Sequence, residues 1–121
     1  MKTFKTLIVI VAALFAFINA NAQSDKSERT IGISTQTIKV NGVCVMCKKR
    51  IENTALLVDG IKSALWDENS KKLILKYSVF KKEAVDNVEQ KLASVGHDND
   101  KYKADDKAYA SLPDCCHYRN S

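Results

Sequence analysis

Hydrophobic and polar residues alternate in three short stretches of the chain, which is the pattern of half-buried strands. Ile38 and Val40 alternate with polar neighbours in the first stretch, and residues 61–66 and 71–77 form the other two. The four polar residues 67–70 separate the second stretch from the third. Because Asp, Asn and Ser favour turns, the last two strands are predicted to form a hairpin.

Hydrophobic residues recur at helical spacing in two segments, residues 46–58 and 82–95. A short strand is expected over residues 97–104, and a helical turn over 105–112. The order is therefore strand, helix, strand, strand, helix, strand. This is the ferredoxin-like βαββαβ arrangement of the α+β class. It predicts a four-stranded antiparallel sheet with two helices on one face, followed by a short C-terminal tail.

The N-terminus has the pattern of a secretory signal peptide. Two lysines precede an apolar run over residues 6–18, and Ala20-Asn21-Ala22 offers small residues for cleavage. The apolar run is short for a transmembrane span, so we expect export without a stable membrane anchor after cleavage. The predicted organisation has four parts: residues 1–22 as signal peptide, 23–33 as flexible leader, 34–104 as the folded domain and 105–121 as tail.

Composition narrows the classes of function. The chain has 121 residues and a net charge of +5, and its basic residues do not form a stripe interleaved with aromatic ones. A nucleic-acid partner is therefore not expected. The small size disfavours a multi-part enzyme site, and we expect a binding protein and not an enzyme.

The four cysteines, Cys44, Cys47, Cys115 and Cys116, fall into two local pairs. In an exported protein, disulfides are the default expectation. Bonds within each pair would close tiny loops and stabilise little, whereas a bond between the pairs would tie the tail to the domain. The spacing alone leaves all three ways of forming two disulfides open.

Cys44 and Cys47 are spaced as Cys-x-x-Cys where a strand passes into a helix. Free N–H groups at a helix start favour the thiolate, so a lowered cysteine pKa is expected there. Thiolates are ligands of soft ions such as Cu(I) and Zn(II). The pair is the primary metal site that the residues predict, and a disulfide or redox pair is the alternative.

Other residues are secondary candidates. The thioether of Met46 and the tail residues 115–117 carry groups that can bind a soft ion. A histidine ligand such as His97 would make the affinity for the metal depend on pH. The basic residues after the second cysteine predict either a docking surface for an acidic partner or a solvated helix face. The candidate additional ligands are Met46, His97, Cys115, Cys116 and His117, and the candidate docking residues are Lys48, Lys49 and Arg50.

Residues 40 to about 104 resemble the heavy-metal-associated domain of copper chaperones, metal-pump N-terminal domains and mercury-binding periplasmic proteins. The resemblance is in Val-Asn-Gly-Val-Cys-Val-Met-Cys over 40–47, Arg-Ile-Glu over 50–52 and Val-Asp-Gly-Ile over 58–61. It implies that Cys44 and Cys47 are the family's two metal-binding cysteines. It also implies that His97 lies near the metal loop. The usual loop reads Gly-Met-Thr-Cys, and this chain lacks that methionine.

The resemblance implies an exported protein that captures a soft ion at the Cys-x-x-Cys loop and transfers it. Cu(I) is the favoured ion, with Zn(II) and Hg(II) as alternatives. The implied partner is a metal-transporting ATPase or another metal-binding protein, the implied compartment is the periplasm, and the chain would be a monomer or a metal-bridged dimer. Two alternatives stay open: a thiol–disulfide exchange protein, and an interaction module whose cysteines form structural disulfides.

Overall fold

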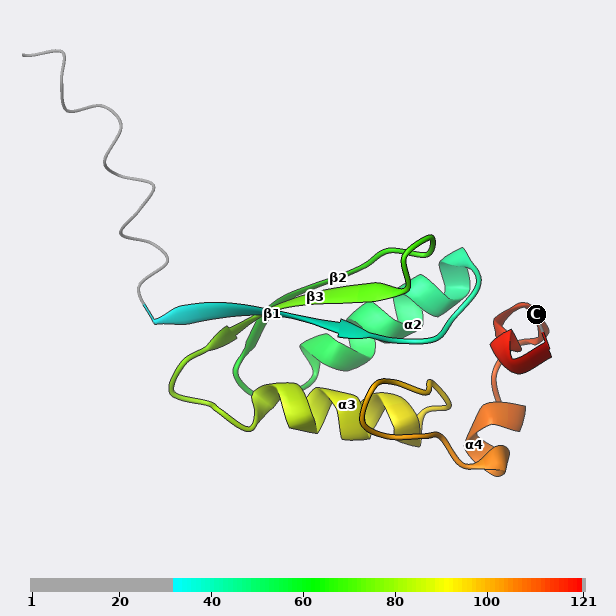
Figure 1. Ribbon diagram of the computed structural model, residues 1–121. Coiled ribbons are helices and arrows are strands. Elements are labelled where there is room, and N and C mark those ends of the chain that lie inside the picture. Colours follow the sequence, from blue (N-terminus) through cyan, green and yellow to red (C-terminus); the bar gives the residue numbers. More distant parts are fainter. Residues whose placement is uncertain (1–31, 121) are drawn as a thin grey trace, which may run out of the picture. The chain divides into compact units, whose positions relative to one another are not determined.

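The computed structural model describes residues 32–120, so the predicted signal peptide and most of the predicted leader lie outside the described residues. Three strands, three α-helices and two short 3₁₀ helices follow one another along this part of the chain (Figure 1). They are β1 (Ile33–Lys39), α2 (Val45–Leu56), β2 (Ile61–Trp66), β3 (Lys72–Ser78), α3 (Ala84–Ser94), α4 (Asp106–Ala110), η3 (Asp114–Cys116) and η4 (Tyr118–Asn120).

The strands form an antiparallel sheet in the order β1-β3-β2. The central strand β3 pairs with β1 from Ser78 opposite Ile33 to Lys72 opposite Lys39. Helices α2 and α3 lie on the same side of the sheet (Figure 1). The α+β class, the first three strands and both helices agree with the prediction from the sequence.

The core fills the space between the sheet and the two helices. Its members come from alternate positions on the strands and from one side of each helix, as the hydrophobic spacing predicts. Trp66, at the end of β2, is the largest side chain that is fully buried. The buried core residues are Ile38, Val40, Cys47, Ile51, Ala55, Val58, Trp66, Leu73, Leu75, Val85, Val88, Leu92, Leu112 and Cys116.

The expected fourth strand over residues 97–104 does not form. Only a single β-bridge forms, between Val40 and Asn99, and the Asp100 carboxylate accepts the N–H of Lys39 at the end of β1. The side chain of Asn99 accepts two N–H groups from within the segment, and Asp98 Oδ1 accepts the N–H of Ala104 at 2.7 Å. Short polar side chains that bond to nearby backbone compete with a strand ladder, and here they replace it.

The turns between elements use the residues that the sequence offers for them. Gly60, after α2, has φ +91°, and a Cβ there would lie 2.6 Å from the Cβ of Lys81. In the turn between β2 and β3, Asp67 Oδ1 accepts the N–H groups of Asn69 and Ser70 at 2.7 and 2.8 Å. The hairpin turn agrees with the prediction from the sequence, and Gly60 supplies the left-handed conformation that ends α2.

The tail leaves α3 and returns to the N-terminal end of α2 (Figure 1). The Asp105 side chain caps α4 by accepting the N–H of Ala108, and Pro113 precedes η3. Leu112 and Cys116 are buried against the domain. The tail is therefore part of the folded structure, and it covers the end where the Cys-x-x-Cys loop lies.

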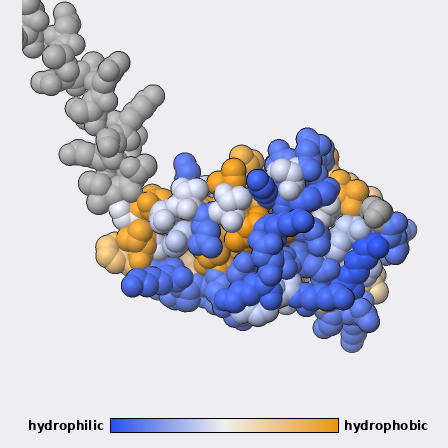
Figure 2. Space-filling view, viewed as in Figure 1, coloured by the Kyte–Doolittle hydropathy of each residue, from blue (hydrophilic) through white to orange (hydrophobic). Residues whose placement is uncertain are grey.

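Hydrophilic residues cover most of the face shown in Figure 2, and hydrophobic residues interrupt it in separate places. Within residues 32–120, no helix combines the length and the apolar composition that a membrane crossing needs.

Candidate metal centre

The loop before α2 rests on the indole of Trp66. The indole Nε1–H donates to the carbonyl of Val40 at 3.0 Å. A Cβ at Gly42 would lie 3.0 Å from the Cβ of Cys47 and 3.1 Å from the indole ring. The absence of a side chain at Gly42 thus lets the loop pass closely over Trp66, which fixes where the first cysteine begins the helix.

The loop cysteines, Cys44 and Cys47, converge as the sequence predicts. Cys44 is the N-cap residue of α2, and Cys47 lies in the first turn of that helix. Their Sγ atoms are 3.6 Å apart. Cys47 is fully buried, and its sulfur accepts the N–H of Val43 at 3.4 Å, whereas Cys44 is partly exposed.

The surroundings of Cys44 favour its thiolate. Burial acts to raise the pKa of this thiol, but the Cys115 thiol and the backbone N–H groups of Cys47 and Met46 outweigh burial and lower the pKa. The Cys44 side chain makes no full capping hydrogen bond, so these N–H groups act on the sulfur mainly as nearby partial charges. The direction of this shift agrees with the lowered pKa expected at a helix start, and the Cys115 thiol contributes more to it than any one backbone N–H group does.

The tail cysteines, Cys115 and Cys116, lie against the loop cysteines. Cys116 forms a disulfide with Cys47, with a Cα–Cα distance of 5.8 Å. Cys44 Sγ lies 2.8 Å from Cys115 Sγ and 3.5 Å from Cys116 Sγ. The bond between the two local pairs is the one that the sequence analysis found most effective as a staple, although the spacing alone did not select it.

Met46 adds a thioether to this group. Its Sδ lies 3.6 Å from Cys115 Sγ, and its side chain is exposed. We use the name sulfur cluster for the two loop cysteines, the two tail cysteines and Met46. Three of its sulfurs, those of Cys44, Cys115 and Cys116, lie within 4.8 Å of one another, which is a spacing that one ion can bridge once Cys116 is reduced.

The two histidines lie apart from the sulfurs. His97 is fully buried and stacks on Tyr118, and its Nδ1 lies 2.8 Å from the carbonyl of Asn41. Because a carbonyl only accepts, Nδ1 carries the proton. Burial lowers the pKa of His97 and keeps the ring neutral. His117 donates from Nε2 to the Leu112 carbonyl at 3.1 Å. Neither imidazole belongs to the cysteine group.

No family model matches the sequence, and no curated protein matches it. A solved structure named "CopZ metallochaperone" is similar to this chain at 25% identity and a TM-score of 0.51. The likeness covers 55% of this chain and 98% of that one. The chain resembles the heavy-metal-associated domain family. A crystal structure of oxidized MerP from Ralstonia metallidurans CH34 is also similar, with 16% identity and a TM-score of 0.46, over 55% of this chain and 94% of that one.

The likeness covers about the length of the heavy-metal-associated domain and leaves about half of the chain outside it. The tail cysteines are thus not explained by the motif that the resemblance rests on, residues 40–61. In this chain the tail cysteines meet the loop cysteines at the position where the motif begins its helix.

The basic residues after Cys47 have separate surroundings. Lys48 pairs with Glu52 at 2.7 Å and donates to the Trp66 carbonyl at 2.6 Å. Lys49 is exposed, and Arg50 is half-buried. Lys48 therefore helps to join α2 to β2, and Lys49 is the one of the three that is most accessible to a partner.

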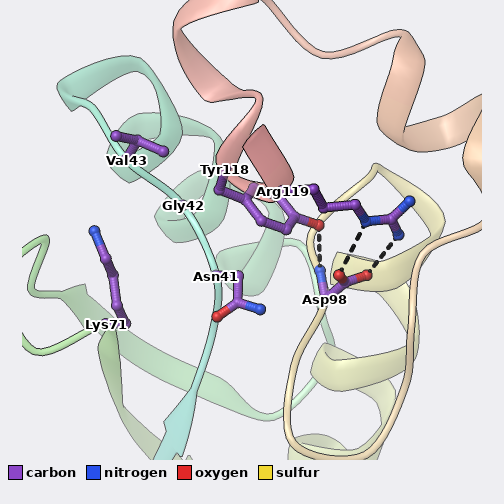
Figure 3. Close-up of a pocket in the computed structure, with 7 residues that line it drawn as sticks. All are labelled: Asn41, Gly42, Val43, Lys71, Asp98, Tyr118 and Arg119. Carbon is purple, nitrogen blue, oxygen red and sulfur yellow. Dashed lines mark hydrogen bonds and ion pairs between the residues drawn. The ribbon is translucent and has the colours of Figure 1, made fainter. Parts of the chain in front are cut away.

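Contacts between Asp98 and the two residues Tyr118 and Arg119 hold the tail in place, and the pattern of the sequence does not predict them. Figure 3 shows Tyr118 and Arg119 directed toward Asp98, across a pocket of about 310 Å³ beside the metal loop. Arg119 pairs with the Asp98 carboxylate, and the Tyr118 hydroxyl accepts the Asp98 N–H at 2.8 Å. The tyrosines Tyr102, Tyr109 and Tyr118 are the sequence signal for packing of this segment, and the structure places Tyr109 and Tyr118 in contact with each other.

Proposed function

We propose that this chain is an exported carrier of a soft metal ion, which the loop cysteines capture and pass to a partner. Cu(I) is the favoured cargo, with Zn(II) and Hg(II) as alternatives, because thiolates select these ions. The convergence of the loop cysteines, with sulfurs 3.6 Å apart at a helix start, carries the proposal. The likeness to a metallochaperone supports it and agrees with the expectation that the chain is not an enzyme.

Loading begins with reduction, because Cys47 is held in the disulfide with Cys116. A dithiol reductant supplies two electrons and two protons. One of its thiolates attacks the protein disulfide and forms a mixed disulfide with one cysteine. Its second thiolate then attacks the mixed disulfide, forms a disulfide within the reductant and releases that cysteine. The products are two cysteine thiols on this chain and one disulfide in the reductant. The ion then replaces the thiol protons of Cys44 and Cys47.

Transfer proceeds by exchange of thiolates. An incoming thiolate of the partner binds the ion before a thiolate of this chain leaves, so the ion is never free and its oxidation state does not change. Cys44 is the partly exposed member of the loop pair and is the first to be reached from solvent. The proposed partner is a metal-transporting ATPase or another metal-binding protein. Lys49, with the less accessible Lys48 and Arg50, would face an acidic surface on it.

The direct test is an anaerobic Cu(I) titration of the fully reduced protein against a chromophoric Cu(I) chelator. We expect one tightly held ion in the wild-type protein. The double variant Cys44→Ser/Cys47→Ser should lose it, whereas Cys115→Ser/Cys116→Ser, a matched loss of two thiols, should still compete with the chelator. Failure of the wild-type protein to compete would refute the carrier proposal, and so would binding that survives in the loop variant.

Export is proposed from residues 1–22 as signal peptide and 23–33 as leader, which precede the domain proposed over 34–104 and the tail over 105–121. Expression of the full chain in a bacterium with a periplasm, followed by N-terminal sequencing of the recovered protein, tests this. We expect protein released from the periplasm that begins at Gln23. An intact Met1 on protein found only in the cytoplasm would contradict the proposal.

A second function, thiol–disulfide exchange, is favoured by one observation. Cys44 Sγ lies 3.5 Å from Cys116 Sγ, which is itself bonded to Cys47. Attack of the Cys44 thiolate on Cys116 would form a Cys44–Cys116 disulfide and release Cys47 as a thiolate, with no net change in oxidation state. A catalysed insulin-reduction assay separates the two functions, since a carrier gives no rate above that of the reductant alone.

A further inference from the structure

The tail is docked on the domain by contacts that involve no sulfur. Arg119 places Nη2 2.9 Å from Asp98 Oδ1 and Nε 3.2 Å from Asp98 Oδ2, which is a two-pronged ion pair (Figure 3). The Tyr118 hydroxyl donates to the Gly96 carbonyl at 2.6 Å and accepts the Asp98 N–H at 2.8 Å. We call Gly96, Asp98, Tyr118 and Arg119 the Asp98 latch. A fork-shaped pair fixes orientation as well as distance.

Packing reinforces the latch from the other side of the tail. The Tyr109 ring meets Tyr118 edge-on at 5.1 Å, and the Arg119 guanidinium lies 4.3 Å from the Tyr109 ring centre. Leu112 is buried beside Gly96. None of these contacts depends on the Cys47–Cys116 disulfide. Reduction therefore breaks one bond of the tail, while the latch keeps the tail cysteines next to the loop cysteines.

Reduction must first separate the bonded sulfurs of Cys47 and Cys116, and the distances from Cys44 to these two sulfurs suit a shared ion better than a two-coordinate one. With metal–sulfur bonds of about 2.3 Å, two thiolates on opposite sides of an ion lie about 4.6 Å apart, whereas those at tetrahedral corners lie about 3.8 Å apart. Cys44 Sγ is 3.6 Å from Cys47 Sγ and 3.5 Å from Cys116 Sγ. Cys115 is closer to Cys44, at 2.8 Å, and it is exposed and free to move outward on binding.

We propose that the Asp98 latch positions the tail cysteines to join the loop cysteines around one ion. The reduced site then takes a thiophilic divalent ion of the Zn(II) class in a four-thiolate sphere, in addition to Cu(I). This inference rests on the proposed function and adds the coordination and the cargo class of the same site. Each cysteine that is still a thiol releases its proton to the solvent as the ion binds. The ligands are Cys44, Cys47, Cys115 and Cys116.

Co(II) is the probe, because tetrahedral thiolate Co(II) has intense visible bands and a thiolate-to-metal charge-transfer band that grows with each thiolate. The reduced protein is titrated with Co(II) under anaerobic conditions. We expect the charge-transfer intensity of the wild type to fall to about three quarters in Cys115→Ser and to about half in Cys115→Ser/Cys116→Ser, in proportion to four, three and two thiolates. Affinity for Co(II) should fall at least tenfold in the double variant.

The latch is tested in the same titration by Arg119→Ala. We expect its spectrum to approach that of the double tail variant, although all four cysteines are present, and Arg119→Lys to restore part of the intensity. Lys101→Ala is the matched control, because it removes the ion pair with Asp86 and contacts no residue of the latch. Far-UV circular dichroism verifies that each variant is folded.

Equal charge-transfer intensity in the wild type and the double tail variant would overturn the four-thiolate site. An unchanged spectrum in Arg119→Ala would overturn the role of the latch. In both cases the loop cysteines would still bind Cu(I), and the proposed function would stand. Loss of both Co(II) and Cu(I) binding in the reduced wild-type protein would overturn the proposed function as well.

Discussion

The body of the domain, residues 33–94, and the segment that follows it, residues 96–120, are built from different interactions. In the body, fully buried hydrophobic side chains fill the space between a sheet and two helices. In the following segment, side chains bond to backbone, a carboxylate pairs with a guanidinium and cysteines meet cysteines. Hydrophobic burial is spread over many non-directional contacts, whereas a segment held by hydrogen bonds and an ion pair depends on the positions of a few atoms. The body therefore supplies a fixed platform, and the position of the tail on it depends on a small number of polar and covalent contacts.

The largest effect is expected from Trp66→Ala in the body. The indole is fully buried under the metal loop and donates to Val40. Its removal leaves a cavity and an unpaired carbonyl, and should lower the free energy of unfolding by about 3–5 kcal/mol. Urea unfolding followed by circular dichroism measures this. Leu65→Ala, at an exposed position of the same strand, is the control and should cost less than about 1 kcal/mol. Equal losses in the two variants would contradict the assignment of Trp66 to the core.

The second effect is on the covalent link between the two regions. The variant Cys116→Ser removes the disulfide and so opens the covalent loop between two cysteines that are 69 residues apart in sequence. The oxidised protein should lose about 2–4 kcal/mol of unfolding free energy. Cys115→Ser is the matched control, because Cys115 is exposed and outside the disulfide. The reduced wild-type protein should unfold at the urea concentration of the reduced Cys116→Ser variant. A loss in Cys115→Ser as large as that in Cys116→Ser would argue for a different pairing.

The same contrast explains how far the sequence predicts the fold and the site. Periodic apolar residues such as Leu73, Leu75, Val88 and Leu92 mark the strands and helices, because burial imposes a spacing of two or of three to four residues. The segment after α3 has no such spacing. Its form depends on which backbone N–H each polar side chain finds, as Asp98 finds that of Ala104, and a linear sequence does not encode these choices in a period.

The candidate site divides in the same way. The convergence of Cys44 and Cys47 follows from their three-residue spacing at a helix start. This spacing is local in the chain, so it can be predicted from the sequence. The approach of Cys116 to Cys47 spans 69 residues, and it is accompanied by the contact between Arg119 and Asp98, which are 21 residues apart in sequence. Neither Asp98 nor Arg119 differs by pattern from the other charged residues of the chain. The meeting of the tail and the loop is therefore information that only the folded structure supplies.

A smaller effect is expected when the latch loses one hydroxyl. Tyr118→Phe removes the bond donated to Gly96 and the one accepted from Asp98. We expect a loss of about 1–2 kcal/mol, because two partly buried backbone groups are left without that partner. Faster alkylation of Cys115 in the reduced variant would show that the tail, and not the body, has loosened. Tyr77→Phe is the control, since no hydrogen bond of its hydroxyl is found among residues 32–120. Unchanged alkylation in Tyr118→Phe would place the docking elsewhere.

The smallest effect is a change in how stability depends on pH. Burial acts to raise the pKa of Asp98, but the Arg119 guanidinium and the Ala104 N–H outweigh burial and hold the pKa below its ordinary value. A carboxyl with a lowered folded-state pKa adds stability above its unfolded pKa of about 3.9, and this is lost as pH falls through the folded value. The stability difference between the wild type and Asp98→Asn should therefore be full near neutral pH and shrink below about pH 4. Urea unfolding at pH 7, 5, 4 and 3 measures it. A difference that stays constant over this range would mean that Asp98 holds the tail by shape alone and that its charge contributes nothing to the latch.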